Sequence, residues 1–161
     1  MNNLKYWLAF SSIEVISSKF ITSVWKHFGS IKEAWFSSYA DLLEIENIKS
    51  TSVKKFIEVR EKINPDILVD EITKKNLKII TIEDQNYPYM LKQIYDPPPL
   101  LYIKGNIDQC NMEKTLAIVG SRKASHYIKE ILSKIIDDLA GEDITIVSGM
   151  ALGVDTCAHK S

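Results

Sequence analysis

The sequence predicts a mixed α/β protein in which a helical N-terminal region precedes part of a parallel β-sheet. Two observations carry this prediction. Apolar residues such as Ile13, Ile16 and Phe20 recur at helical spacing in the first 76 residues. From residue 77 onward, runs rich in β-branched residues flank one long amphipathic stretch, and a strand–helix–strand order is typical of parallel sheets. We therefore expect a helical domain over residues 1–76 and an α/β domain over residues 77–161.

Local signals divide the helical region into segments. Ser11, with a glutamate three residues later, has the spacing of a capping box and predicts a helix that starts there and ends at Gly29. Residues 30–33 repeat the capping signal and predict the start of the next helix. A tight turn is expected near residues 46–50, and Pro65 suits the first turn of a further helix.

The second region shows an alternation of strand and helix signals. Three consecutive prolines at 97–99 favour an extended segment between the first two strands. The run 115–121 is apolar enough to predict a buried strand, and Gly141 is expected to end the helix that follows it. The expected strands are residues 77–84, 100–106, 115–121 and 144–150, and the expected helix is residues 125–141.

Two of these strands end in glycine–serine turns, "IVGSRKAS" and "IVSGMALG". Both turns are expected at the carboxyl edge of the sheet, where open α/β sheets bind ligands. Unpaired amides at the following helix starts, serine hydroxyls and one arginine would suit a phosphate group. Neither turn is a Walker A or G-x-G-x-x-G sequence, so a pair of plain tight turns remains the alternative. The predicted phosphate-binding residues are Gly120, Ser121, Arg122, Ser148, Gly149, Met150, Ala151 and Gly153.

Composition limits the ways in which this chain could bind a polyanion. The formal net charge of the 161 residues is −1, and from residue 116 onward five basic residues face six acidic ones. Binding of nucleic acid by bulk charge is therefore excluded, and only a focused pocket remains. Two cysteines are too few for a disulfide framework. No export signal or membrane span is expected, which predicts a cytoplasmic protein.

Other chemistry-bearing residues have a simpler structural interpretation. Trp7, Trp25 and Trp35 fall in the helical region and are expected in its core, with base stacking as the alternative. Cys157 and His159 resemble half of a metal site, but side chains two residues apart on a helix point in different directions. No nucleophile has a visible base beside it. We therefore expect no catalytic residue, no metal and no cofactor.

Three stretches of the chain resemble the DNA-processing protein A (DprA/Smf) family. They are "YPYMLKQIYDPPPLLYIKGN", "LAIVGSRKAS" and "TIVSGMALGVDTCAHKS", in the order and spacing of that family. The resemblance implies a helical domain of the sterile-alpha-motif or helix-hairpin-helix-like type over residues 1–76 and a Rossmann-like domain over residues 77–161. Because family members continue further, it also implies that the sequence ends inside the second domain.

The resemblance carries a functional expectation. It implies a binding protein rather than an enzyme, which protects single-stranded DNA during natural transformation and helps to load the recombinase RecA. It implies a homodimer for full-length members. In the family the two turns line the DNA phosphate pocket, and the matching positions here are Gly120, Ser121, Arg122, Ser148, Gly149 and Gly153.

Two departures and two alternatives accompany this expectation. Ile128 stands where the family commonly has glycine, and Val154 is a conservative exchange. One alternative is a nucleotide hydrolase on a related Rossmann-like scaffold, although the Pro-Gly-Gly-x-x-Thr-x-x-Glu stretch of such enzymes is absent from the sequence. The other is a nonfunctional fragment in which only the helical domain folds.

Overall fold

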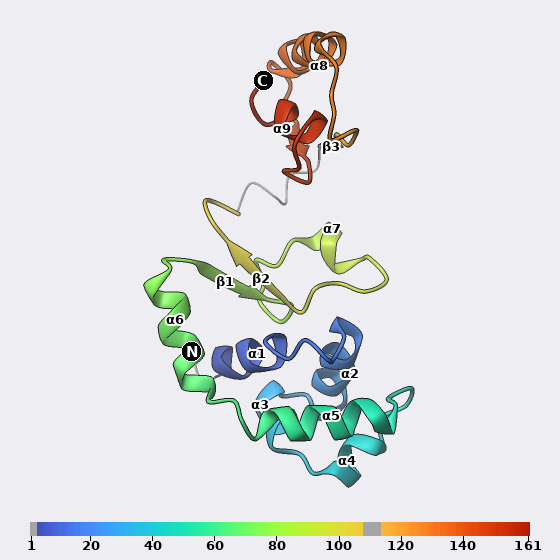
Figure 1. Cartoon of the computed structure of the whole chain (residues 1–161), viewed down its shortest axis with the longest axis vertical. Coiled ribbons are helices and arrows are strands. Elements are labelled where there is room, and N and C mark those ends of the chain that lie inside the picture. The colour runs from blue at the N-terminus through green and yellow to red at the C-terminus, as the bar shows by residue number, and fades with distance from the viewer. Residues whose placement is uncertain (1–2, 108–113) are drawn as a thin grey trace. The chain divides into compact units, whose positions relative to one another are not determined.

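The chain forms two compact units, which are described separately. A computed structural model describes residues 3–107 and 114–161 (Figure 1). The N-terminal unit spans Met1–Ile107 and the C-terminal unit spans Asp108–Ser161. The predicted class is confirmed at the level of a mixed α/β chain, with a helical N-terminal region followed by small sheets.

Helices make up most of the N-terminal unit (Figure 1). Their bounds are α1 Leu4–Ser11, α2 Ser18–Phe28, α3 Ile31–Phe36, α4 Tyr39–Leu43, α5 Ser50–Arg60, α6 Pro65–Lys74 and α7 Tyr89–Lys92. Several local predictions are confirmed. Gly29 ends α2 in the left-handed conformation at φ 67°, Ser30 caps α3, and Pro65 opens α6.

The predicted capping box at Ser11 is wrong. Helix α1 continues through Ser11, and α2 begins seven positions later at Ser18. Its N-cap is Ser17, whose hydroxyl accepts a hydrogen bond from the Phe20 amide at 3.2 Å. The reason is burial, because all five residues from Tyr6 to Phe10 lie in the core and hold α1 in place up to its last turn. Tertiary packing thus overrides a local capping signal.

Aromatic side chains dominate the core of the N-terminal unit. Phe10 and Phe56 stack with ring centroids 4.9 Å apart, and Trp35 meets Phe10 edge-on at 5.2 Å. Trp7 is fully buried and its ring lies 5.6 Å from that of Trp25. The prediction that the tryptophans are core residues is confirmed for Trp7 and Trp35, which are 0% and 4% exposed.

A two-stranded antiparallel sheet completes this core. Strand β1 (Lys78–Thr81) pairs with β2 (Leu100–Ile103), and Ile80 and Leu100 belong to the same buried cluster as the helices. The side chain of Trp7 donates a hydrogen bond to Glu83 just after β1, at 3.0 Å. The two compact units of the structure are therefore separated after residue 107. The change from helical to strand-like residue patterns predicted a domain boundary between residues 76 and 77, and that boundary stays a prediction.

The C-terminal unit contains the predicted strand–helix–strand arrangement. Strand β3 (Thr115–Ala117) leads into α8 (His126–Leu139), then β4 (Thr145–Val147) and the short helix α9 (Val154–Ala158). Strands β3 and β4 are parallel and in register, with Leu116 opposite Ile146. The parallel pair is confirmed, but β1 and β2 form a separate sheet rather than joining it.

The core of the C-terminal unit is small. Leu132, Val154 and Ala158 are its buried hydrophobic residues, and Ile118 and Ile146 pack against them. The predicted apolar face of α8 is only partly covered, since Ile128 and Ile135 are 40% and 45% exposed. All three residues of β3 are exposed as well, contrary to the buried strand predicted, because β4 is its only strand neighbour within the described residues.

Candidate functional site

The turns that follow β3 and β4 lie against each other. The amide of Val154 donates a hydrogen bond to the carbonyl oxygen of Ser121 at 3.1 Å. Gly153 has a φ of +91°, and a Cβ placed on it would be 2.2 Å from the same carbonyl oxygen. A Cβ on Gly120 would be 2.7 Å from a methyl group of Val154. Both glycines are therefore required for the close approach of the two turns.

The two serine hydroxyls of these turns have different roles. The hydroxyl of Ser148 donates to the carbonyl oxygen of Ile118 at 2.7 Å, so its proton ties the end of β4 to the end of β3. The hydroxyl of Ser121 accepts a hydrogen bond from the Lys123 amide at 3.0 Å, which leaves its proton available to a ligand. Sequence reasoning treated both hydroxyls as donors to a phosphate, and the geometry favours this role only for Ser121.

The middle of the second turn is less suited to an anion. A carboxylate oxygen of Asp155, a residue that is only 7% exposed, lies 2.9 Å from the position of a Cβ on Gly149. A negative charge there would repel a phosphate at the Gly149 amide. Met150 adopts a φ of 58° and is 81% exposed, and the Ala151 carbonyl oxygen accepts hydrogen bonds from Thr156.

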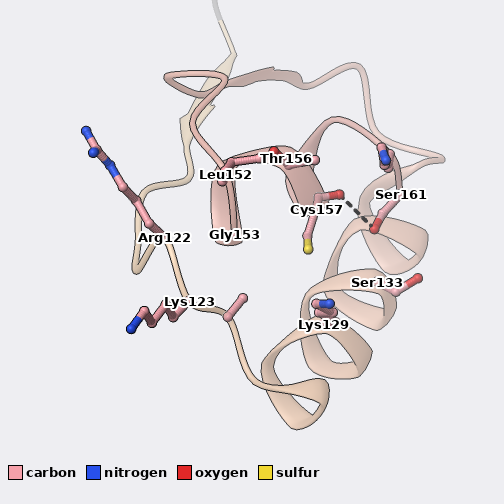
Figure 2. A pocket seen from close by; sticks show the side chains of 11 residues that line it. Arg122, Lys123, Lys129, Ser133, Leu152, Gly153, Thr156, Cys157 and Ser161 are labelled. Carbon is pink, nitrogen blue, oxygen red and sulfur yellow. Dashed lines mark hydrogen bonds between the residues drawn. The ribbon is translucent and has the colours of Figure 1, made fainter.

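A cavity with a cationic lining adjoins the first turn. Its volume is about 530 Å³, and Arg122, Lys123, Lys129 and Lys160 contribute to its wall. Figure 2 shows Arg122 and Lys123 on the segment before α8, and Lys129 and Ser133 on α8 itself. Chain segments 30 or more residues apart thus contribute four cationic residues to the wall of one concavity.

The positive charge of this cavity is not neutralised within the part of the chain that the structure describes. None of the described lining residues is acidic, and none of the four cations has an ion-pair partner among the described residues. The net charge of the region from residue 116 onward is slightly negative, so the asymmetry is local. Such a concentration of like charge is chemically suited to an anion.

The structure brings together only part of the predicted site. Arg122 and Gly153 line the cavity, whereas the other six predicted residues are not among its described lining residues. Lys123, Lys129 and Lys160 were not predicted from the sequence as lining residues, because the net charge of a sequence stretch does not show where its charged residues lie in the fold. One available signal was the spacing of Lys129 and Ser133, four residues apart on one face of α8.

The described residues contain neither a cluster of potential metal ligands nor a helix that could span a membrane. No group of three or more potential metal ligands occurs in 3–107 and 114–161. In the same ranges, no helix is long and apolar enough to cross a bilayer. Cys157 is half-buried with a free thiol, and His159 is exposed.

Comparison with known proteins places these features in a family. The family model described as "DNA recombination-mediator protein A" matches residues 78–161, which is just over half of the chain. The chain belongs to the DNA recombination-mediator protein A (DprA/Smf) family. All eight predicted phosphate-binding residues and all four cavity cations lie inside the matched range.

Individual relatives extend the similarity across the chain. Protein Smf of Synechocystis sp. is 32% identical over 159 residues, which cover 97% of this chain and 40% of that protein. The DNA processing protein DprA of Streptococcus pneumoniae is 44% identical over 81 residues, covering 50% of this chain and 28% of that protein. The X-ray structure of DprA from Streptococcus pneumoniae matches with a TM-score of 0.75 and 30% identity, over 99% of this chain and 53% of that one.

These comparisons establish a DprA-like fold over nearly the whole chain. The chain spans 40% of the Synechocystis protein and 46% of Protein Smf from Borreliella burgdorferi, that is, less than half of each. The prediction from sequence that this is a DprA/Smf family member is thereby confirmed.

Proposed function

We propose that the chain binds single-stranded DNA through the cationic cavity of the C-terminal unit, as part of a recombination mediator. The observation that carries this proposal is a set of four cationic residues in the wall of one cavity, none with an ion-pair partner in the part of the chain that the structure describes: Arg122, Lys123, Lys129 and Lys160. Family membership supplies the ligand class, because relatives carry names that refer to DNA processing and recombination.

The cavity favours backbone recognition over sequence recognition. Arginine can donate two parallel hydrogen bonds to one phosphate, and lysines act as point charges around it. The hydroxyl of Ser121 adds a donor beside Arg122. A chain with a net charge of −1 gains little from long-range attraction, so binding depends on these few contacts.

The same cavity is poorly equipped for catalysis. Its described lining offers positive charge, hydroxyl groups and one thiol, but no aspartate, glutamate or histidine side chain that could act as a general base. We therefore propose a binding role without a chemical step, and no cofactor enters it.

The test is a titration of a fluorescent oligothymidylate with the full chain at several salt concentrations. Four phosphate contacts predict a log–log salt slope of about −3, since each contact to a single strand contributes about −0.7. The double variant Arg122→Ala/Lys129→Ala should lower the magnitude of this slope by about 1.4. It should also weaken binding at low salt.

Lys134→Ala is the matched control, because this exposed lysine lies on α8 but not on the cavity wall. It should leave both slope and affinity close to those of the unmodified chain. Equal effects of Lys129→Ala and Lys134→Ala would show that general charge, and not this cavity, attracts the DNA.

The proposal extends to the other expectations that family membership supplies. We propose that the parallel pair β3–β4 with α8 is the beginning of a Rossmann-like sheet, and that DNA bound there is passed to RecA during natural transformation. A RecA loading assay on single strands coated with single-strand-binding protein tests this, with the Arg122→Ala/Lys129→Ala variant as the inactive reference. No acceleration by the unmodified chain would refute the loading role.

A further inference from the structure

The N-terminal unit carries an exposed aromatic residue beside a positive charge. The side chain of Tyr95, in the loop after α7, is 90% exposed. The ammonium group of Lys19 lies 5.4 Å from the centre of its ring and 3.2 Å from its hydroxyl oxygen. These two residues are 76 positions apart in the sequence, so the fold itself creates the pair.

The loop that presents Tyr95 is anchored at its base. Tyr87 precedes α7, is 3% exposed, and donates a hydrogen bond from its hydroxyl to the carbonyl oxygen of Pro98 at 2.8 Å. Proline at positions 97–99 restricts the backbone on the far side of the loop. An aromatic ring held in water by an anchored loop loses little conformational entropy when a flat ligand stacks on it.

A second cavity begins at the same lysine. Its volume is about 260 Å³, and its wall includes Lys19 and Lys49 together with the hydroxyl groups of Ser17, Ser23 and Ser52. None of its described lining residues is acidic, and neither lysine has an ion-pair partner among the described residues. Lys19 therefore connects an exposed ring on one side with a polar, positively charged hollow on the other.

We infer that Tyr95, Lys19 and Lys49 form a second contact surface for single-stranded DNA, separate from the cavity of the C-terminal unit. A base would stack on the ring of Tyr95, and an adjacent phosphate would bind between Lys19 and Lys49. Every base has a face that can stack, so this combination of one aromatic ring and a positively charged hollow accepts any sequence.

Charge favours this ligand over a protein partner. The neighbouring residues Met90 and Ile94 are also exposed. The hollow beside Tyr95 has Phe20 and Ile48 in its wall, but its charged groups are two lysines, and three serine hydroxyls accompany them, which suits a phosphate. The choice of DNA over RNA rests on the proposed function. The existence of the surface does not, because its residues all belong to the N-terminal unit.

The experiment uses the full chain carrying Arg122→Ala/Lys129→Ala, so that the first cavity no longer dominates binding. In this background, Tyr95→Ala should weaken oligothymidylate binding roughly 5- to 100-fold, as expected for the loss of one stacked base. Tyr95→Phe should retain most of the affinity, because the ring remains. Lys49→Ala should reduce the magnitude of the salt slope by about 0.7, whereas Lys55→Ala on α5, the helix that Lys49 precedes, should not.

Cross-linking gives an independent readout of position. An oligonucleotide containing 5-iododeoxyuridine should form a photochemical cross-link to the peptide that contains Tyr95. Cross-links confined to residues 114–161, or equal affinity of the Tyr95→Ala and unmodified chains in the same background, would overturn the inference. Dissociation of a dimer by Tyr95→Ala with no loss of DNA affinity would also overturn it, by showing a contact between copies of the chain.

The two proposals fail in distinguishable ways. If Arg122→Ala/Lys129→Ala has no effect but Tyr95→Ala does, the proposed site in the C-terminal unit is wrong and the second surface stands. If Arg122→Ala/Lys129→Ala weakens binding but Tyr95→Ala does not, the second surface is wrong and the site in the C-terminal unit stands.

Discussion

Replacement of Gly153 by alanine tests whether the two turns are held together as the structure shows. The added Cβ would lie 2.2 Å from the carbonyl oxygen of Ser121 and 2.6 Å from the carbonyl carbon and oxygen of Arg122. Both neighbours are backbone atoms, which cannot move aside as a flexible side chain could. The turn that carries Arg122 must therefore shift, or the start of α9 must separate from it.

Two contributions set the size of the effect. The backbone conformation, with φ 91° and ψ −127°, is one that glycine alone adopts without strain, and alanine there costs about 1–3 kcal/mol. Relief of the steric overlap adds about 1–3 kcal/mol, as in other overpacked sites. We expect a loss of about 2–6 kcal/mol in the free energy of unfolding of the C-terminal unit. Its small core makes such a loss sufficient to unfold much of the population.

The assay must report on the C-terminal unit alone. All three tryptophans lie in the N-terminal unit, so fluorescence is blind to this change, and hydrogen exchange of the α8 amides is the suitable measurement. Gly141→Ala is a control in the same unit, since its Cβ would meet nothing within 4 Å. Exchange in Gly153→Ala within about 0.5 kcal/mol of the unmodified chain would refute the packing of the two turns.

Two further predictions concern the N-terminal unit. Phe56→Ala should lower the free energy of unfolding of this unit by about 3–5 kcal/mol, because the fully buried ring stacks on Phe10. Denaturant titration followed by tryptophan fluorescence measures this loss. The control is Phe36→Ala, whose residue is 67% exposed, and a loss for Phe56→Ala no larger than that of the control would contradict the prediction. A hydrogen bond from the backbone amide of Ser38 lowers the pKa of Asp41 below its ordinary value of 3.8. The carboxylate therefore stabilises the fold above that ordinary value and ceases to do so as the pH falls through the lowered pKa. Asp41→Asn, which keeps an acceptor without the charge, should flatten the acid limb of a plot of stability against pH, and an unchanged limb would argue against the capping box.

The parts of the fold that could be predicted are those set by neighbouring residues. Gly29, Ser30 and Pro65 act within one helical turn, and each lies at the helix boundary that its chemistry predicts. The apolar periodicity of α8 and the β-branched runs on either side likewise predicted the parallel pair. The prediction that a helix starts at Ser11 was wrong, because exposing the buried residues 6–10 would cost more free energy than one N-cap hydrogen bond contributes.

The parts that could not be predicted depend on contacts between distant residues. Nothing local shows that β1 and β2 pack on the helices of the N-terminal unit, because that packing joins Ile80 and Leu100 to residues near the chain start. The cavity cations are another example, since Lys160 and Arg122 line the same cavity although they are 38 positions apart in the sequence. The sequence predicted that the Ser148 hydroxyl donates to a ligand. Its acceptor in the structure, the Ile118 carbonyl oxygen, follows strand β3 and is 30 positions away in the sequence, so no local pattern indicates it.

The hydrogen bond between Trp7 and Glu83 has a consequence for synthesis of the chain. Trp7 of helix α1 is synthesised 76 residues before its hydrogen-bond partner Glu83. At a translation rate of about 5–20 residues per second, the apolar face of α1 waits for roughly 4–15 s before β1 and its flanking residues emerge. During that interval the indole N–H of Trp7 lacks its acceptor Glu83, whereas the ring partners of Phe10, Trp35 and Phe56, have already emerged. The native environment of Trp7 is therefore completed later than that of Phe10.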